Sequence, residues 1–215
     1  MKIGILISGR GSNLKALINA CEEPGFRGHI ALVISNRPGA AGLDIAKAAG
    51  IPTLVIDHKE FTTRETFDAE LDRALTKAGV ELVCNAGFMR ILTDGFVEKW
   101  RDRQLNIHPS LLPAFKGLHV HQRALDAGVR ITGCTVHFVR PEMDEGPIVA
   151  QAAVPVLPGD TAETLAARIL EAEHKLYPLA LRLVVEGRAR VGEHVVLNDV
   201  DGTDIPAPLF MPTLQ

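Results

Sequence analysis

Apolar runs alternate with amphipathic stretches along the first hundred residues. Residues 2–8 and 29–35 are almost continuous apolar runs, typical of strands buried on both faces of a parallel sheet. After the first run, Leu14, Leu17 and Ile18 recur at helical spacing and predict a helix. The same alternation predicts further strands at 53–56 and 80–86 and helices at about 40–49, 63–78 and 94–100. Strand and helix in alternation are the signature of a doubly wound α/β fold.

The pattern changes in the second half of the chain. A strand end at 105–108 runs into a loop at 109–117, and a helix is expected at about 119–127. Two further strands, 131–139 and 148–156, are separated by only eight residues. Because eight residues are too few for a crossover helix, we expect these two strands to pair antiparallel.

A long amphipathic helix is expected from Asp160 to about residue 186. Asp160 can cap its N-terminus while Glu163 occupies the third helical position. Pro178 lies inside the helix and predicts a kink. In the tail that follows, Asp201 and Gly202 predict a hairpin turn.

These elements predict one domain over residues 1–190, followed by a C-terminal tail at 191–215. The expected architecture is a Rossmann-like, doubly wound, mixed and mostly parallel sheet. It would carry helices on both faces and end in an antiparallel hairpin.

Composition and charge exclude several classes of protein. The chain has 215 residues, and 47% of them are hydrophobic. Its net charge of −3 argues against nonspecific electrostatic binding to nucleic acid or to an acidic membrane. Apolar runs of about 18 residues, as a membrane span needs, do not occur. Three cysteines without CxxC spacing indicate buried thiols in a reducing cytoplasm.

A glycine-rich loop, Gly9-Arg-Gly11-Ser12-Asn13, lies between the first strand and the first helix. Free N–H groups at a helix N-terminus attract anions, and glycines let a phosphate approach the backbone. The loop could equally be a tight turn in which Ser12 or Asn13 caps the helix. Leu14 stands where a dinucleotide fingerprint has its third glycine, so the phosphate of a smaller ligand fits better than NAD.

Asn106 and His108 lie two residues apart at a predicted strand end, which places both side chains on one face. Asp144 belongs to the loop of the late hairpin. An imidazole can carry a proton, a carboxylate can orient it, and an amide can donate to a developing oxyanion. Together the three would suit acyl transfer, whereas singly each could serve only a turn or a solvated surface.

Three other histidines, His119, His121 and His137, could suggest a metal site. His119 and His121 open a predicted helix, where side chains two apart diverge, and no HExxH motif or cysteine pair accompanies them. We therefore expect no metal.

Glu173 falls on the inward stripe of the long helix, between Ile169 and Leu176. An inward carboxylate is costly unless it is paired. It could bond a buried arginine, or it could hold an amine of a ligand.

Four segments carry a close family resemblance, which covers essentially residues 1–190. They are ISGRGSNL (7–14), AGFMRIL (86–92), NIHPSLLP (106–113) and GCTVHFVRPEMDEGPIV (133–149). With them the chain resembles the phosphoribosylglycinamide formyltransferases, the folate-dependent transformylases of purine synthesis. The family often has a glycine after the aspartate that matches Asp144, where this chain has Glu145.

The resemblance implies roles for individual residues. Those that would hold the ribonucleotide are Gly11, Ser12 and Asn13 at its phosphate, helped by Arg64, and Glu173 at its amine. Those that would line the folate pocket are Met89, Arg90, Ile91, Leu92 and Val97, with the backbone of Arg140, Pro141, Glu142, Met143 and Asp144 reading the pterin-like ring. Those that would perform the chemistry are Asn106, His108 and Asp144.

The resemblance also implies an activity. The formyl group of 10-formyltetrahydrofolate would pass to the amine of glycinamide ribonucleotide, giving formylglycinamide ribonucleotide in de novo purine biosynthesis. The amine would attack directly and form a tetrahedral intermediate, with Asp144 keeping His108 protonated. Residues 1–100 would form the nucleotide-binding half and residues 101–190 the folate-binding and catalytic half.

Three other classes of protein would be compatible with part of this sequence pattern. A formyltetrahydrofolate deformylase would usually have an extra N-terminal domain, and a methionyl-tRNA formyltransferase a basic C-terminal domain. A binding module without catalysis would not need all three residues Asn106, His108 and Asp144. We expect small-molecule partners only, no nucleic acid, no membrane and a cytoplasmic location. A homodimer, the preferred folate polyglutamate length and the role of the tail are left open.

Overall fold

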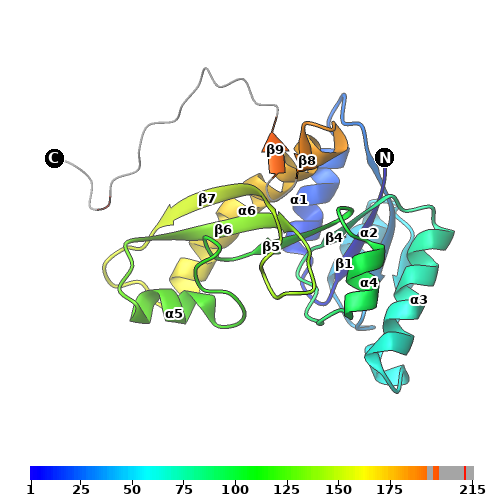
Figure 1. Ribbon diagram of the computed structural model, residues 1–215, viewed down its shortest axis with the longest axis horizontal. Coiled ribbons are helices and arrows are strands. Elements are labelled where there is room, and N and C mark those ends of the chain that lie inside the picture. The colour runs from blue at the N-terminus through cyan, green and yellow to red at the C-terminus, as the bar shows by residue number, and fades with distance from the viewer. Residues whose placement is uncertain (193–195, 199–210, 212–215) are drawn as a thin grey trace.

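The computed structural model describes residues 1–192, 196–198 and 211 (Figure 1). Its helices are α1 (Ser12–Cys21), α2 (Gly42–Ala48), the 3₁₀ helix η1 (His58–Glu60), α3 (Arg64–Lys77), α4 (Asp94–Lys99), α5 (Val120–Asp126) and α6 (Ala162–Val185). Its strands are β1 (Lys2–Ile7), β2 (His29–Ser35), β3 (Thr53–Val55), β4 (Leu82–Asn85), β5 (Gln104–His108), β6 (Ile131–Phe138), β7 (Ile148–Pro155), β8 (Ala189–Val191) and β9 (Val196–Asn198). The predicted alternation of strands and helices is confirmed.

Seven strands form the main sheet in the order β3-β2-β1-β4-β5-β6-β7. The pairs from β3 to β5 are parallel, whereas β5 with β6 and β6 with β7 are antiparallel, as expected for the late hairpin. The order reverses between β1 and β4, so the loops that follow these two strands leave the sheet side by side. In open α/β sheets this switch point is where ligands bind.

Two hydrophobic cores lie on opposite faces of the sheet. Because successive side chains of a strand point to opposite faces, Ile5 of β1 enters the first core and Leu6 the second. The first core packs α1, α2 and α6 against the sheet, and the second packs α3 and α4. Figure 1 shows α3 and α4 beside the N-terminal strands, at the opposite end from the long β6–β7 hairpin.

The far half of the sheet is different, because β5 to β7 contribute only to the first core among the described residues. On β5, Leu105 and Ile107 enter that core, and Asn106 and His108 therefore point to the opposite face. On β6, His137 is the register partner of Asn106. This polar face of β5 and β6 bears the side chains that the sequence singled out for chemistry.

The start of α6 corrects one prediction. Thr161, not Asp160, is the N-cap, and its hydroxyl forms a capping box with Thr164 instead of Glu163. Asp160 is engaged elsewhere, because its carboxylate pairs with Arg168 at 2.8 Å. The helix continues through Pro178 to Val185.

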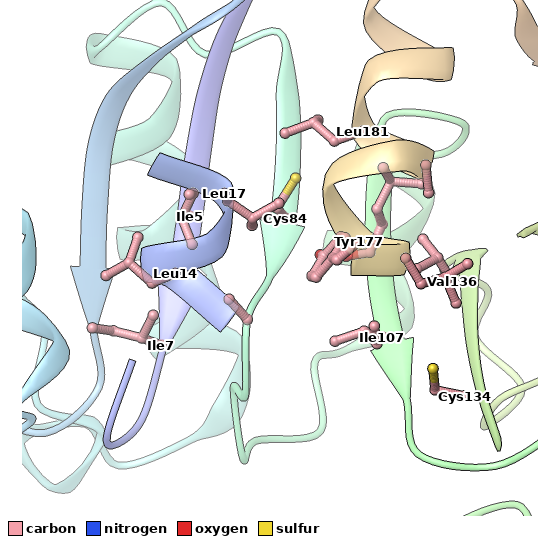
Figure 2. Packing of buried hydrophobic residues seen from close by; sticks show 14 of the residues in the cluster. Ile5, Ile7, Leu14, Leu17, Cys84, Ile107, Cys134, Val136, Tyr177 and Leu181 are labelled. Carbon is pink, nitrogen blue, oxygen red and sulfur yellow. The ribbon is translucent and has the colours of Figure 1, made fainter. Parts of the chain in front are cut away.

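A fully buried tyrosine fixes α6 to the sheet. The hydroxyl of Tyr177 donates to the carbonyls of Asn85 on β4 and Leu105 on β5, at 3.1 and 3.2 Å. In Figure 2 the Tyr177 ring lies between the strand of Cys84 and that of Ile107. One hydroxyl thus joins the helix that carries Glu173 to two neighbouring strands of the main sheet.

The cysteines carry free thiols. Cys84 and Cys134 are buried as expected, while Cys21 is partly exposed. Burial raises the pKa of Cys84 and Cys134 to about 12, so neither is a nucleophile at neutral pH. β8 pairs with β9 across the predicted boundary at residue 190, and the predicted turn at Asp201 and Gly202 lies outside the described residues.

Candidate active site

The glycine loop ends in a helix N-terminus without a side-chain cap. The N-cap is Gly11, in the left-handed conformation with φ 76°, rather than Ser12 or Asn13. A Cβ at Gly11 would lie 2.5 Å from the Cα of Gly42, so α2 is packed directly against the loop. Because no side chain caps α1, the first N–H groups of the helix stay available to an anion.

Asn13 and Glu173 meet at the base of this loop. The amide Nδ2 of Asn13 donates to Oε2 of Glu173 at 2.7 Å, and both side chains are buried. Burial raises the pKa of Glu173, and the bond from Asn13 opposes that rise. Of the two options left open, the arginine partner is not the contact found, and an amide takes its place.

A groove of about 560 Å³ runs between α1 and α6 beside the loop. Ser12, Lys15 and Lys175 line it, together with His174, whose buried Nε2 has no hydrogen-bond partner. Burial lowers the pKa of His174. His174 was not among the predicted site residues, and its position directly after the inward-facing Glu173 was the available signal.

Asn106 faces His137 across the β5–β6 pair. Its Nδ2 lies 3.3 Å from Nε2 of His137, while Nδ1 of His137 lies 3.0 Å from the carbonyl of Phe138. Burial lowers the pKa of His137, although the carbonyl of Phe138 and the charge of Asp144 oppose this. A neutral His137 that donates from Nδ1 accepts at Nε2 and orients the amide of Asn106, leaving the second N–H of that amide for a ligand.

The fold brings Asp144 to His108. Oδ2 of Asp144 lies 3.4 Å from Nδ1 of His108, and Oδ1 lies 3.8 Å from Nε2 of His137. Nε2 of His108 lies 3.0 Å from the carbonyl of Phe115, which can only accept, so Nε2 carries a proton. A proton on Nδ1 as well would face the carboxylate of Asp144. Both ring nitrogens of His108 are therefore engaged by the protein in this structure.

Two loops are tied together around Asp144. Its Oδ2 accepts from the backbone N–H of Gly117 at 2.8 Å, and Asp144 itself is in the left-handed conformation. Glu145, the next residue, pairs with Lys116 at 2.7 Å. This ion pair adds a second link between the same two loops.

The residues expected to bind folate come from two segments beside the switch point. Met89 and Ile91 are 69% and 63% exposed, and Met143 in the facing loop is 54% exposed. Exposed apolar side chains of this kind are available for contact with a ligand. Val97 is buried in α4, Glu142 is exposed, and Arg140 pairs with Asp102.

A groove of about 570 Å³ continues from this surface between α3 and α4. Ile91, Leu92 and Pro141 line it together with Arg64, the first residue of α3. The sequence analysis expected Arg64 at the phosphate, but the neighbours it shares this groove with belong to the predicted folate side. The buried Nε of Arg90 has no hydrogen-bond partner.

Within the described part of the chain, no group of three or more His, Cys, Asp or Glu side chains is arranged to hold a metal ion. His119 is the N-cap of α5 and His121 its second residue. Over the same residues, no helix has the length and hydrophobicity that crossing a bilayer requires.

A family model described as formyl transferase matches residues 1–181. The chain belongs to the formyl transferase family. It is 43% identical to phosphoribosylglycinamide formyltransferase from Escherichia coli (strain K12), over 96% of each chain. It also superimposes on glycinamide ribonucleotide transformylase 1 from Symbiobacterium toebii with a TM-score of 0.89 and 49% identity, covering 92% of this chain and 93% of that one.

A longer relative matches as well. The chain is 56% identical over 193 residues to the trifunctional purine biosynthetic protein adenosine-3 of Gallus gallus. It spans 90% of its own length but only 19% of that protein.

Proposed function

We propose that this chain transfers the formyl group of 10-formyltetrahydrofolate to the amine of glycinamide ribonucleotide. The product is formylglycinamide ribonucleotide, an intermediate of de novo purine biosynthesis. The observation that carries the proposal is the convergence of Asn106, His108 and Asp144 on one polar face, beside the switch point of a formyl transferase fold. The names of the full-length relatives support the same acceptor.

The ribonucleotide binds along α1 and α6. Its phosphate contacts the uncapped N-terminus of α1 at residues 11–13, where Lys15 and His174 add positive charge and a free ring nitrogen. Glu173 accepts from the glycinamide amine with the carboxylate that Asn13 already orients. Among the described residues, Asn13 is the one hydrogen-bond partner of this buried carboxylate, which is therefore suited to bind an amine.

The formyl donor binds between 89–92 and 140–144. The exposed side chains of Met89, Ile91 and Met143 form an apolar surface for its ring system, and the adjoining groove has room for its tail. Arg64 stays a predicted phosphate contact, although its groove neighbours favour a role on the donor side.

The chemistry follows from the hydrogen-bond roles of the three residues. Asn106 donates its second N–H to the oxygen of the formyl group, and His108 turns its Nε2–H from the carbonyl of Phe115 to the same oxygen. The acceptor amine forms its bond to the formyl carbon as charge develops on that oxygen, giving a tetrahedral intermediate.

Collapse of that intermediate breaks the carbon–nitrogen bond to the donor. The acceptor loses one proton and the donor nitrogen gains one, and Asp144 relays this proton through water. Asp144 also stabilises the protonated ring of His108 across 3.4 Å.

On the same grounds we propose that residues 1–190 act as a single domain in the cytoplasm, without a metal.

The test is an assay of the purified chain with 10-formyltetrahydrofolate, in which glycinamide ribonucleotide and water compete as acceptors. We expect formylglycinamide ribonucleotide as the product and no formate above the rate of the uncatalysed control. Formate release without ribonucleotide would instead identify a formyltetrahydrofolate deformylase.

A further inference from the structure

The segment 86–93, which joins β4 to α4, is held by hydrogen bonds from other parts of the chain as well as by packing. It has neither helix nor strand, and Gly87 adopts a left-handed conformation with φ 74°. Phe88 and Leu92 pack against the second core, whereas Met89 and Ile91, which are assigned to the donor, are exposed. The positions of Met89 and Ile91 therefore depend on bonds to the segment's backbone as well as on their two packed neighbours.

Buried side chains from two other elements make such bonds. Midway along the segment, the N–H of Met89 donates to Oγ of Ser8 at 2.7 Å. At its end, the N–H and the hydroxyl of Thr93 donate to Oδ2 of Asp68 at 2.6 and 2.7 Å. At its start, the N–H of Ala86 donates to the carbonyl of Leu6 at 2.9 Å, which is ordinary strand pairing.

Neither tethering side chain can move freely. Ser8 is only 4% exposed, and its Oγ also lies 2.6 Å from Oδ1 of Asn36 at the end of β2. Asp68 is 3% exposed and belongs to the inner face of α3. Ser8 directly follows β1 and precedes the glycine loop, so one hydroxyl connects the two loops of the switch point.

We propose that Ser8 and Asp68 are positioning residues for the formyl donor: they fix the backbone of 86–93 in the shape that binds it. This inference rests on the proposed function. Neither residue touches the reacting atoms in this assignment. Their removal acts on donor binding, because a loop that must be ordered on binding weakens affinity.

The experiment compares two pairs of matched variants. Ser8→Ala removes the tether at Met89, and Ser35→Ala is its control, because Ser35 is a buried serine at the end of the adjacent strand β2 that bonds only its own turn at Arg37. Asp68→Ala removes the tether at Thr93. Glu70→Ala is its control, since Glu70 lies two residues further along α3, outside the groove, and its carboxylate bonds Arg73 instead.

Calorimetry measures the dissociation constants of 10-formyltetrahydrofolate and of glycinamide ribonucleotide separately, and urea unfolding measures stability. We expect Ser8→Ala and Asp68→Ala to weaken donor binding by about 5- to 30-fold, the loss expected for one unsatisfied buried hydrogen-bonding group. Ribonucleotide binding should change by less than about twofold, which is below the effect of one net hydrogen bond. Asp68→Asn keeps an acceptor for Thr93 and should restore most of the donor affinity.

Three results would overturn the proposal. They are unchanged donor affinity in both tether variants, an equal loss for both ligands, or an equal loss in the Ser35 and Glu70 controls. If Ser8→Ala does not fold, the comparison of Asp68→Ala with Asp68→Asn and Glu70→Ala decides the question. Failure of the unmodified chain to bind the donor would refute the proposed function itself, which is a different outcome.

Discussion

Asn13 and Glu173 are 160 residues apart in the sequence, yet the amide of one donates to the carboxylate of the other at 2.7 Å. This bond joins the first turn after the glycine loop to the middle of α6. It places the carboxylate proposed to hold the substrate amine beside the N-terminus proposed to hold the substrate phosphate. The proposed ribonucleotide site therefore combines residues of α1 and α6.

Replacing Glu173 by Gln separates the charge from the shape. The amide oxygen still accepts from Asn13, so the fold should survive. Ribonucleotide binding should weaken on the order of 10- to 100-fold, because a hydrogen bond to a charged group contributes about 1.5–3 kcal/mol. Calorimetric titration with glycinamide ribonucleotide measures the effect, and unchanged affinity would reduce Glu173 to a structural partner of Asn13.

The Glu173→Gln variant also tests how the stability of the chain depends on pH. Burial raises the pKa of Glu173 above its ordinary value of 4.5, so between pH 4.5 and the raised pKa the folded chain binds more protons at this group than the unfolded chain does. The stability of the unmodified chain should then fall, relative to Glu173→Gln, as the pH rises through this window. Urea unfolding at several pH values measures the difference, and a difference that does not depend on pH would contradict the assignment.

The glycine loop offers an internally controlled pair of variants. Gly11→Ala adds a side chain where φ is 76° and where a Cβ would lie 2.5 Å from the Cα of Gly42. Gly9→Ala adds one where no atom lies within 4 Å. We expect Gly11→Ala to cost roughly 1–2 kcal/mol of stability for the left-handed residue.

Substrate binding should be affected by Gly11→Ala and not by Gly9→Ala. Gly11→Ala should raise the KM for the ribonucleotide and leave folate affinity nearly unchanged, while Gly9→Ala should resemble the unmodified chain. Steady-state kinetics with each substrate varied in turn distinguishes these effects. Equal weakening of both ligands would count against a phosphate site at residues 11–13.

Tyr177→Phe tests the link between α6 and the sheet. The variant keeps the ring in the core but leaves the carbonyls of Asn85 and Leu105 without their shared donor. Buried groups that lose a partner cost about 1–3 kcal/mol each, so we expect a lower urea midpoint with an unchanged m-value. A midpoint equal to that of the unmodified chain would show that the hydroxyl does not stabilise this junction.

Much of the fold follows from local patterns in the sequence. Period-two alternation placed Asn106 and His108 on one face, and the structure confirms it because Leu105 and Ile107 enter the core between and beside them. The eight-residue connection between the last two long strands likewise forced an antiparallel pair. These inferences needed only spacing and chain length.

Other features depend on contacts that no local pattern encodes. Asp160 and Thr161 are both good caps. The structure uses Thr161 as the N-cap, while the carboxylate of Asp160 pairs with Arg168, eight residues further on, and accepts from the hydroxyl of Thr164. Nothing in the sequence relates His137 to Asn106, because only the register of β6 against β5 places the two residues opposite each other. The positioning roles proposed for Ser8 and Asp68 rest on their hydrogen bonds to Met89 and Thr93, which only the folded chain brings close to them.

The interaction of His108 with Asp144 can be observed directly. In the unmodified chain, ¹⁵N NMR of the imidazole should show a proton on Nε2, because the carbonyl of Phe115 can only accept. The chemical shift of Nδ1 should reflect the carboxylate of Asp144, which lies 3.4 Å away. In Asp144→Asn we expect the Nδ1 resonance to move while the Nε2 proton remains, and an unchanged spectrum would show that the two side chains do not interact.

If the Asn106–His108–Asp144 cluster performs the formyl transfer, His108→Ala should lose the reaction and keep the substrates. Pre-steady-state transfer from 10-formyltetrahydrofolate to glycinamide ribonucleotide gives the rate of the chemical step, and calorimetry gives the affinity of each substrate. We expect this rate to fall about 10²- to 10³-fold, the loss typical of one oxyanion donor, while both dissociation constants stay within a few-fold of the unmodified chain. A variant that transfers the formyl group at the unmodified rate, or that loses activity only because it no longer binds a substrate, would refute this role of the cluster.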